Sequence, residues 1–261
     1  MELWLLNSFS TVTLTLLVVG GSVLLAIAAS TLATRRFPRL VEGENNDMVG
    51  VVLSLFGAIY GIILAFVIVN LWTQFQDTQK VVATEATSIS QIVRDARAFP
   101  PDAQATVDGA VRDYVHAVVE QQWPLMNAGH GDFAATSAKV DDLYTALRAY
   151  EPQTQSQQAF YAEALDSLND AVGQRRARIF ASRDELPALL QVLILGGAVV
   201  IMLLTLLYGI RSRRTRLLFV GSVAALIGFS LLLVPVLDRP FAGGVSVSPE
   251  PFKQSALAEF W

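Results

Sequence analysis

The stretch FGAIYGIILAFVIVNLWTQFQDTQKVVATEA, residues 56–86, begins as a run of apolar side chains and ends as a run of mostly polar ones. No glycine or proline interrupts it after Gly61. Because glycine and proline are the residues that most often end a helix, one continuous helix is expected to cross the change in polarity. This helix sets the expected fold, since it would join an apolar part of the chain to a polar part.

Four long stretches of the chain carry no charged residue, and a helix that spans a bilayer needs about 20 apolar residues. These stretches are Leu3–Thr34, Met48–Gln76, Leu186–Ile210 and Leu217–Leu237. The first is expected to be a retained helix, because a signal peptide has positive charge before its apolar region and here only Glu2 precedes it. The sequence therefore predicts an integral membrane protein with four spans.

Arginines gather in the two short loops that join neighbouring spans. RRFPR (Arg35–Arg39) joins the first two, and RSRRTR (Arg211–Arg216) joins the last two. Positive charge in short loops stays in the cytoplasm. We therefore expect a multi-pass membrane protein whose termini and polar segment 72–187 lie outside the cytoplasm.

The polar segment has the periodicity of packed helices. An apolar seam with alternating spacings of three and four is typical of side-by-side helices, and it runs through Trp72, Phe75, Gln79, Val82, Ala86, Ile89, Val93 and Ala96. Further amphipathic helices are predicted over about 102–126, 133–150 and 153–185. No stretch alternates as a strand would, so we predict a four-helix bundle whose first and last helices continue spans two and three.

The predicted fold is thus an all-α integral membrane protein: four transmembrane helices with a four-helix-bundle domain inserted between helices 2 and 3. Its expected parts are residues 1–71 (helices 1 and 2 with the arginine loop), 72–187 (the bundle), 188–237 (helices 3 and 4) and 238–261. In the last part, a short interfacial helix would place Phe252, Phe260 and Trp261 among lipid headgroups.

Small residues form a stripe along the second span and are candidates for close helix packing. They are Gly50, Ser54, Gly57, Gly61 and Ala65. Such a stripe serves contacts either within one subunit or between subunits around an axis. No ionisable residue lies in any span, which argues against an ion-coupled transporter. Phe66 is a candidate hydrophobic constriction, and Asn70 is either an interfacial amide or a dipole that lines a pore.

Among the residue types that catalyse reactions or bind metals, cysteine is absent and histidine is rare. The only histidines, His116 and His130, fall on different predicted elements, and no phosphate-binding loop or catalytic motif occurs. RRAR (175–178) is expected to be a salt-bridged surface. With a net charge of −4, nucleic-acid binding is not expected. We therefore predict no enzyme, no cofactor and no metal site.

Three stretches resemble one family: LAFVIVNLWTQFQDTQKVVATEATSISQIVRDARAFP (64–100), VRDYVHAVVEQQWPLM (111–126) and LDRPFAGGVSVSPEPF (237–252). They resemble the bestrophin-like domain of unknown function 4239, a family of bacterial membrane proteins. The family name implies similarity to bestrophins, which are pentameric chloride channels with a large cytoplasmic domain and a pore neck lined by the second span. Carried over by position, this resemblance adds Val67 to Phe66 and Asn70 as neck candidates.

Two further features concern the polar parts of the chain. Segment 73–187 holds 16 acidic and 10 basic residues, and an acidic vestibule concentrates cations rather than anions. Asp238, Arg239, Pro240 and Phe241 follow the last span at the membrane edge. They either cap and anchor that helix end or begin a segment that folds over the bundle base or the pore mouth.

Taken together, these features predict a homo-oligomer in the lipid bilayer that acts as a passive bestrophin-like ion channel lined by the second span, with ions as its cargo. The alternative is a non-conducting envelope scaffold, sensor or accessory subunit whose bundle binds a partner.

Overall fold

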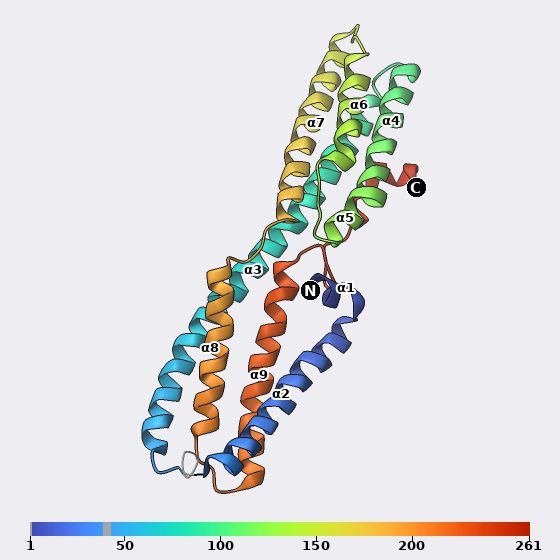
Figure 1. Cartoon of the computed structure of the whole chain (residues 1–261). Coiled ribbons are helices and arrows are strands. Elements are labelled where there is room, and N and C mark those ends of the chain that lie inside the picture. Colours follow the sequence, from blue (N-terminus) through green and yellow to red (C-terminus); the bar gives the residue numbers. More distant parts are fainter. Residues whose placement is uncertain (1, 39–42) are drawn as a thin grey trace. The chain divides into compact units, whose positions relative to one another are not determined.

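The computed structural model describes residues 2–38 and 43–261, which form helices and turns without a strand, in agreement with the all-α prediction (Figure 1). Arg39, part of the predicted arginine loop, lies outside the described residues. The chain divides into two compact units. The apolar unit comprises the chain up to Thr73 together with Glu185–Asp238, and the polar unit comprises Gln74–Asp184 and Arg239–Trp261.

Long apolar helices make up the apolar unit. Its helices are α1 (Glu2–Ser8), α2 (Thr11–Arg36), the first part of α3 (Asn46–Ala96), α8 (Ala188–Leu207) and α9 (Arg213–Asp238). Within the described residues, α2, α3, α8 and α9 are long and apolar enough to cross a bilayer, with mean hydropathies of 2.4 to 2.7. The prediction of four candidate spans is therefore confirmed.

The first predicted span is two helices rather than one. α1 ends at Ser8, and α2 begins after Ser10, whose side chain accepts a hydrogen bond from the backbone N–H of Thr13 at 3.2 Å. A serine in this position satisfies one of the unpaired N–H groups of a helix start. A search for uncharged stretches does not detect this helix start, because the cap is formed by a hydroxyl group rather than by a charged side chain.

α2 and α9 pack through small side chains. A methyl group added at Gly228 would lie 2.8 Å from the Oγ atom of Ser22 and 3.3 Å from the Cα atom of Val19. Further along the pair, Ala26 is buried together with Val220 and Ala224. As α2 proceeds, its partners come from progressively earlier in α9, so the two helices are antiparallel. Small residues allow such close approach in lipid.

The polar unit contains the second part of α3 and the remaining helices. They are α4 (Pro101–His116), the π-helix η2 (Ala117–Gln122), α5 (Trp123–Asn127), α6 (Ala134–Arg148), α7 (Gln155–Ala181) and the 3₁₀ helices η3 (Glu250–Lys253) and η4 (Ser255–Phe260). Pro100 and Pro101 end the preceding segment and begin α4. Thr154 and Gln157 form a reciprocal capping box at the start of α7.

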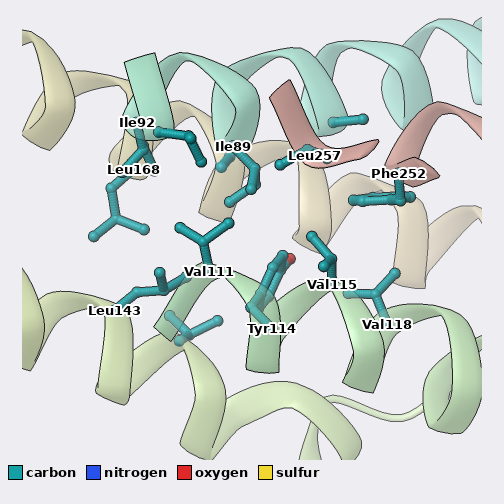
Figure 2. Close-up of a cluster of buried hydrophobic side chains, with 14 of the residues drawn as sticks. Ile89, Ile92, Val111, Tyr114, Val115, Val118, Leu143, Leu168, Phe252 and Leu257 are labelled. Atoms are coloured by element: carbon teal, nitrogen blue, oxygen red, sulfur yellow. The ribbon is translucent and has the colours of Figure 1, made fainter. Parts of the chain in front are cut away.

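One hydrophobic core holds the polar unit together, and Figure 2 shows its centre. Ile89 and Ile92 from α3 face Val111 and Val115 from α4, and Leu168 from α7 lies among them. Leu143 of α6 and Leu257 of η4 complete this layer. Burying such side chains is the main favourable term in folding, so the core explains why these amphipathic helices gather.

The predicted seam of α3 is partly wrong. Trp72 and Gln79 are exposed, whereas Thr78 and Glu85 are buried. The buried positions with heptad spacing are Leu71, Phe75, Thr78, Val82, Glu85, Ile89, Ile92 and Ala96. Polar side chains are tolerated there because each has a hydrogen-bond partner; the hydroxyl of Thr78, for example, donates to the carbonyl of Gln74 at 2.8 Å.

The end of the chain also differs from its prediction. Phe252 is fully buried in the polar unit's core, and Trp261 stacks on His116 with ring centroids 4.2 Å apart. Phe252 is therefore not among lipid headgroups, because its ring is packed within the core of the polar unit.

Candidate functional site

The part of α3 in the apolar unit has a largely uncovered surface. Only 6% of its most apolar 18-residue stretch is buried by the chain, against 33% of the corresponding stretch of α9. The side chain of Phe66 is 73% exposed, and Asn70, one helical turn later, is also exposed. Residues four apart lie on the same face of a helix. Phe66 and Asn70 thus place an aromatic ring and an amide on one face of α3, and the rest of the chain does not cover that face.

Val67 has a different environment from its neighbour Phe66. It is buried with Leu64 and Leu71, also from α3, in a cluster that includes Ile194 of α8 and Leu237 of α9. The three neck candidates therefore do not share one face, because Val67 points into the chain's own packing. This inward face fixes the rotation of α3 in the apolar unit and so directs Phe66 outward.

The small-residue stripe of α3 lies mostly on uncovered surface. Ser54, Gly61 and Ala65 are exposed, and a methyl group added at Gly57 or Gly61 would meet no atom within 4 Å. Gly50 is the exception, since a methyl group there would lie 3.4 Å from the ring of Tyr208. Four of the five predicted packing positions are therefore either exposed or have open space beside them within this chain.

Two polar contacts hold α3 to α8 and to the turn that follows it. The side chain of Asn46 donates to the carbonyl of Gly209 at 2.7 Å and accepts from the N–H of Gly209 at 2.8 Å. Further along, the hydroxyl of Tyr60 donates to the carbonyl of Ile194 at 3.1 Å. The ring of Tyr60 lies directly against Gly197, where a Cβ atom would overlap it. These contacts hold the uncovered face of α3 in a defined orientation.

The membrane-edge motif is divided between the two units. Asp238 is buried at the end of α9, where its carboxylate accepts a hydrogen bond from the N–H of Leu186 at 2.9 Å. That bond joins the end of α9 to the residues that lead into α8. In the polar unit, Pro240 and Phe241 are buried and Arg239 is half-buried. The ring of Phe241 meets the ring of Trp123 edge-on, with centroids 5.5 Å apart.

A fully buried ion pair lies in the core of the polar unit. The guanidinium of Arg178 in α7 donates to both carboxylate oxygens of Glu85 in α3, at 2.7 and 2.9 Å, and neither side chain is exposed. Tyr114 donates its hydroxyl to the same carboxylate at 2.6 Å. The guanidinium also lies over the rings of Trp123 and Phe252, at 5.6 and 5.8 Å.

Burial and the neighbouring charges explain the protonation states of Tyr114 and Arg178. Burial, and after it the neighbouring Glu85 carboxylate, raises the pKa of Tyr114 well above its usual value, so the phenol remains a neutral donor. Burial alone would lower the pKa of Arg178, but the charge and hydrogen bonds of Glu85 outweigh it and the pKa is raised. The arrangement therefore neutralises a buried carboxylate and links three helices; it leaves no reactive group free.

The RRAR stretch is not the expected surface. Of its three arginines, Arg175 and Arg178 are buried and Arg176 is exposed. Arg175 donates to the hydroxyl of Thr136 and to the carbonyl of Phe133, each at 2.7 Å. A spacing of three places the two buried arginines on the inner face of α7. That spacing, together with Glu85 at a seam position, was the signal in the sequence for buried charge.

His116 holds the end of the chain in the polar unit. Its Nδ1 atom lies 2.8 Å from the carboxylate of Glu120, and its Nε2 atom lies 2.9 Å from the carbonyl oxygen of Phe260. Both partners are acceptors, and only the imidazolium form donates from both nitrogens. The hydrogen bond to Glu120 and then that to Phe260 raise the pKa of His116. Within the described residues, no cluster of three or more His, Asp or Glu side chains could hold a metal ion.

Comparisons with known proteins agree with this architecture. A search of curated sequences found no match. Two solved structures share the fold. One, a single-residue variant of a bacterial bestrophin homologue from Klebsiella pneumoniae, is 11% identical, with 93% of this chain and 97% of that chain covered and a TM-score of 0.71. The other, a variant of a membrane protein, is 12% identical over the same shares, with a TM-score of 0.70. A bestrophin-like domain is matched over residues 20–252, nearly the whole length, and the chain belongs to this bestrophin-like family.

Proposed function

We propose that this protein is a homo-oligomeric, passive ion channel in which the uncovered face of α3 lines a central axis. The observation that carries the proposal is the small share of the α3 span that its own chain buries, 6%. A helix that carries no charged residue along its span and is covered by so little of its own chain must be covered by lipid or by further copies. Membership of a channel-type family favours further copies.

Phe66 and Asn70 are proposed to line the axis. A ring of exposed phenylalanines closes a pore by excluding water, and a ring of amides offers dipoles to a passing ion. Val67 is proposed to stand behind this lining, because it packs against Leu64 and Leu71 and holds the helix in its rotation. The preference between anions and cations follows the charge of the entrance, and the net charge of −6 over segment 73–187 favours cations.

The small-residue stripe of α3 is proposed to pack against a neighbouring subunit. A side chain at Gly57 or Gly61 would meet nothing close within the chain, Ala65 is exposed, and small side chains let two helices approach in lipid. The polar segment is proposed to be a bundle inserted between the second and third spans and to stand in water. The two arginine clusters, near Arg35 and Arg213, are proposed to face the cytoplasm of a bacterial inner membrane.

The first test is an electron cryo-microscopy map of the full chain in lipid nanodiscs. We expect a ring of three or more copies around an axis lined by α3. A monomer, or a dimer with a dry closed interface, would refute the channel and leave the non-conducting scaffold, whose bundle binds a partner, as the better assignment.

The second test is ion flux into liposomes that contain the protein. Phe66→Ala should raise the flux, because it removes the constriction. Leu226→Ala is the matched control, since Leu226 is a similarly large side chain that is 71% exposed on α9. Equal flux through wild type and Phe66→Ala would remove Phe66 as the constriction, and an equal rise in both variants would point to leak through a loosened protein.

A further inference from the structure

An apolar groove runs along the packed pair α2 and α9 in the apolar unit. Its volume is about 650 Å³, within the range of ligand-binding sites. Small and aliphatic side chains line it, with one charged residue, Arg214, at its end; the other lining residues are Val23, Ile27, Leu217, Leu218, Gly221, Ser222 and Ala225. The groove is therefore apolar along its length and ends at a guanidinium group.

Arginines without acidic partners surround that end. α2 finishes with Arg35 and Arg36, and the antiparallel α9 begins with Arg213, Arg214 and Arg216. Across the part of the chain that the structure describes, none of these five forms an ion pair. At this end of the helix pair, the described chain therefore supplies no acidic side chain to balance the five guanidinium groups.

An anion at this position is supplied by the bilayer itself. The arginines stand at the end of two spans, at the depth where lipid phosphates lie, and basic sites between spanning helices bind anionic headgroups. Guanidinium groups suit phosphate because they donate two parallel hydrogen bonds. The neighbouring groove suits an acyl chain because its walls are apolar.

We propose that this groove binds one anionic phospholipid from the leaflet at the arginine end of α2 and α9. Its phosphate accepts hydrogen bonds from Arg214, and one acyl chain lies along Leu217, Gly221 and Ala225. A zwitterionic lipid binds less well, because its own ammonium group is repelled by the arginines. Free phosphate leaves the groove empty and gains nothing from its apolar walls. The proposal does not depend on ion conduction.

The test is native mass spectrometry of the full chain, released from detergent that contains equal amounts of phosphatidylglycerol and phosphatidylcholine. We expect wild type to retain phosphatidylglycerol preferentially. Arg214→Ala should lower that retention about fivefold, since one cation near a headgroup contributes about that factor. Arg176→Ala is the matched control, because Arg176 is exposed in the polar unit, and it should leave retention unchanged.

A second variant tests the groove itself. Gly221→Leu adds an aliphatic side chain where a Cβ atom would be 3.8 Å from Val23, so it fills the groove without overlap at its first atom and leaves every arginine in place. We expect it to lower phosphatidylglycerol retention as much as Arg214→Ala does. Ala225→Leu serves the same purpose if the first variant elutes as an aggregate.

Four outcomes of the experiment with the two lipids would overturn the proposal. They are equal retention of the two lipids by wild type, no effect of Arg214→Ala, an equal effect of Arg176→Ala, and undiminished retention by a groove-filling variant that folds. The last would mean that the arginines attract headgroups generally. Release of the lipid by an excess of inorganic phosphate would likewise refute it, since the site would then recognise a free anion.

Discussion

Replacing Arg178 by Met should destabilise the polar unit strongly. The variant keeps a side chain of comparable length but removes both hydrogen bonds to Glu85, at 2.7 and 2.9 Å. The carboxylate would remain fully buried with only the hydroxyl of Tyr114 as a partner. Removing one member of a buried ion pair typically costs about 3–5 kcal/mol, because the remaining charge is left uncompensated.

The same reasoning predicts a partial recovery when the whole polar group is removed. In the triple variant Glu85→Leu, Tyr114→Phe and Arg178→Met, no charge and no hydroxyl is left without a partner. Replacing a buried pair by apolar side chains of similar volume is often close to neutral, so we expect a loss within about 2 kcal/mol of wild type. The variant with fewer substitutions should therefore be the less stable one.

The assay is thermal unfolding of the full chain in nanodiscs, followed by circular dichroism. A loss of about 3–5 kcal/mol corresponds to a midpoint lower by roughly 6–20 °C for a unit of this size. Arg176→Met is the control, because Arg176 is exposed on the same helix, and a surface substitution should change stability by less than about 0.5 kcal/mol.

Two results would refute this reasoning. If Arg178→Met melted like Arg176→Met, the buried pair would contribute nothing measurable to the fold. If the triple variant melted no higher than Arg178→Met, the loss would come from packing around Arg178 rather than from an uncompensated carboxylate.

Three further predictions concern other contacts. Gly228→Leu should separate α2 from α9, since its Cβ atom would lie 2.8 Å from the Oγ atom of Ser22, and overpacking of this kind costs about 1–3 kcal/mol, measurable as a lower melting midpoint. Asn46→Ala removes both hydrogen bonds to the backbone of Gly209, and we expect a loss of about 1–3 kcal/mol in the same assay, together with faster hydrogen exchange at the turn. The raised pKa of His116 means that its contribution to stability is complete below its unfolded pKa and is lost as the pH rises through the folded value. The difference in melting midpoint between wild type and His116→Gln should therefore shrink as the pH rises, and a constant difference would contradict the assignment.

The spans were predictable because lipid imposes a simple rule. A backbone in hydrocarbon must satisfy its own hydrogen bonds, so an uncharged stretch of sufficient length is a helix. The break between α1 and α2 escaped this rule, although Ser10 and Thr13 carried the signal of a helix start. Hydropathy reports only that a segment lacks charged side chains. A helix cap depends on one particular side chain, so it has to be looked for separately.

The seam of α3 shows why counting apolar residues was not enough. Trp72 and Gln79 were placed on the expected seam, while the buried Thr78 and Glu85 were not. Burial of Glu85 is possible only because Arg178, 93 positions later in the chain, comes to meet it. Periodicity along one helix contains no information on a partner so distant. For the same reason the RRAR stretch was predicted to be a surface.

For the candidate pore-lining residues, the sequence likewise did not show which face of the helix each side chain occupies. Phe66, Val67 and Asn70 were chosen by their place along the helix, yet the face of each depends on the packing of α3 against α8 and α9. Burial of Val67 with Leu71 turns Phe66 outward. The position of a residue along a span was thus predictable, whereas its direction needed the contacts of the folded chain.

The arginines of the two units differ in their partners, and this difference connects the fold with the membrane. Arg175 and Arg178 are buried, and each is satisfied by oxygen atoms of the chain. Arg214 and Arg216, at the start of α9, have no acidic partner among the described residues, although the chain holds 23 acidic residues against 19 basic ones. A shortage of carboxylates therefore does not explain the unpaired cluster. In the proposed lipid site, that charge is balanced by a lipid phosphate, the anion that a bilayer supplies at the end of a span.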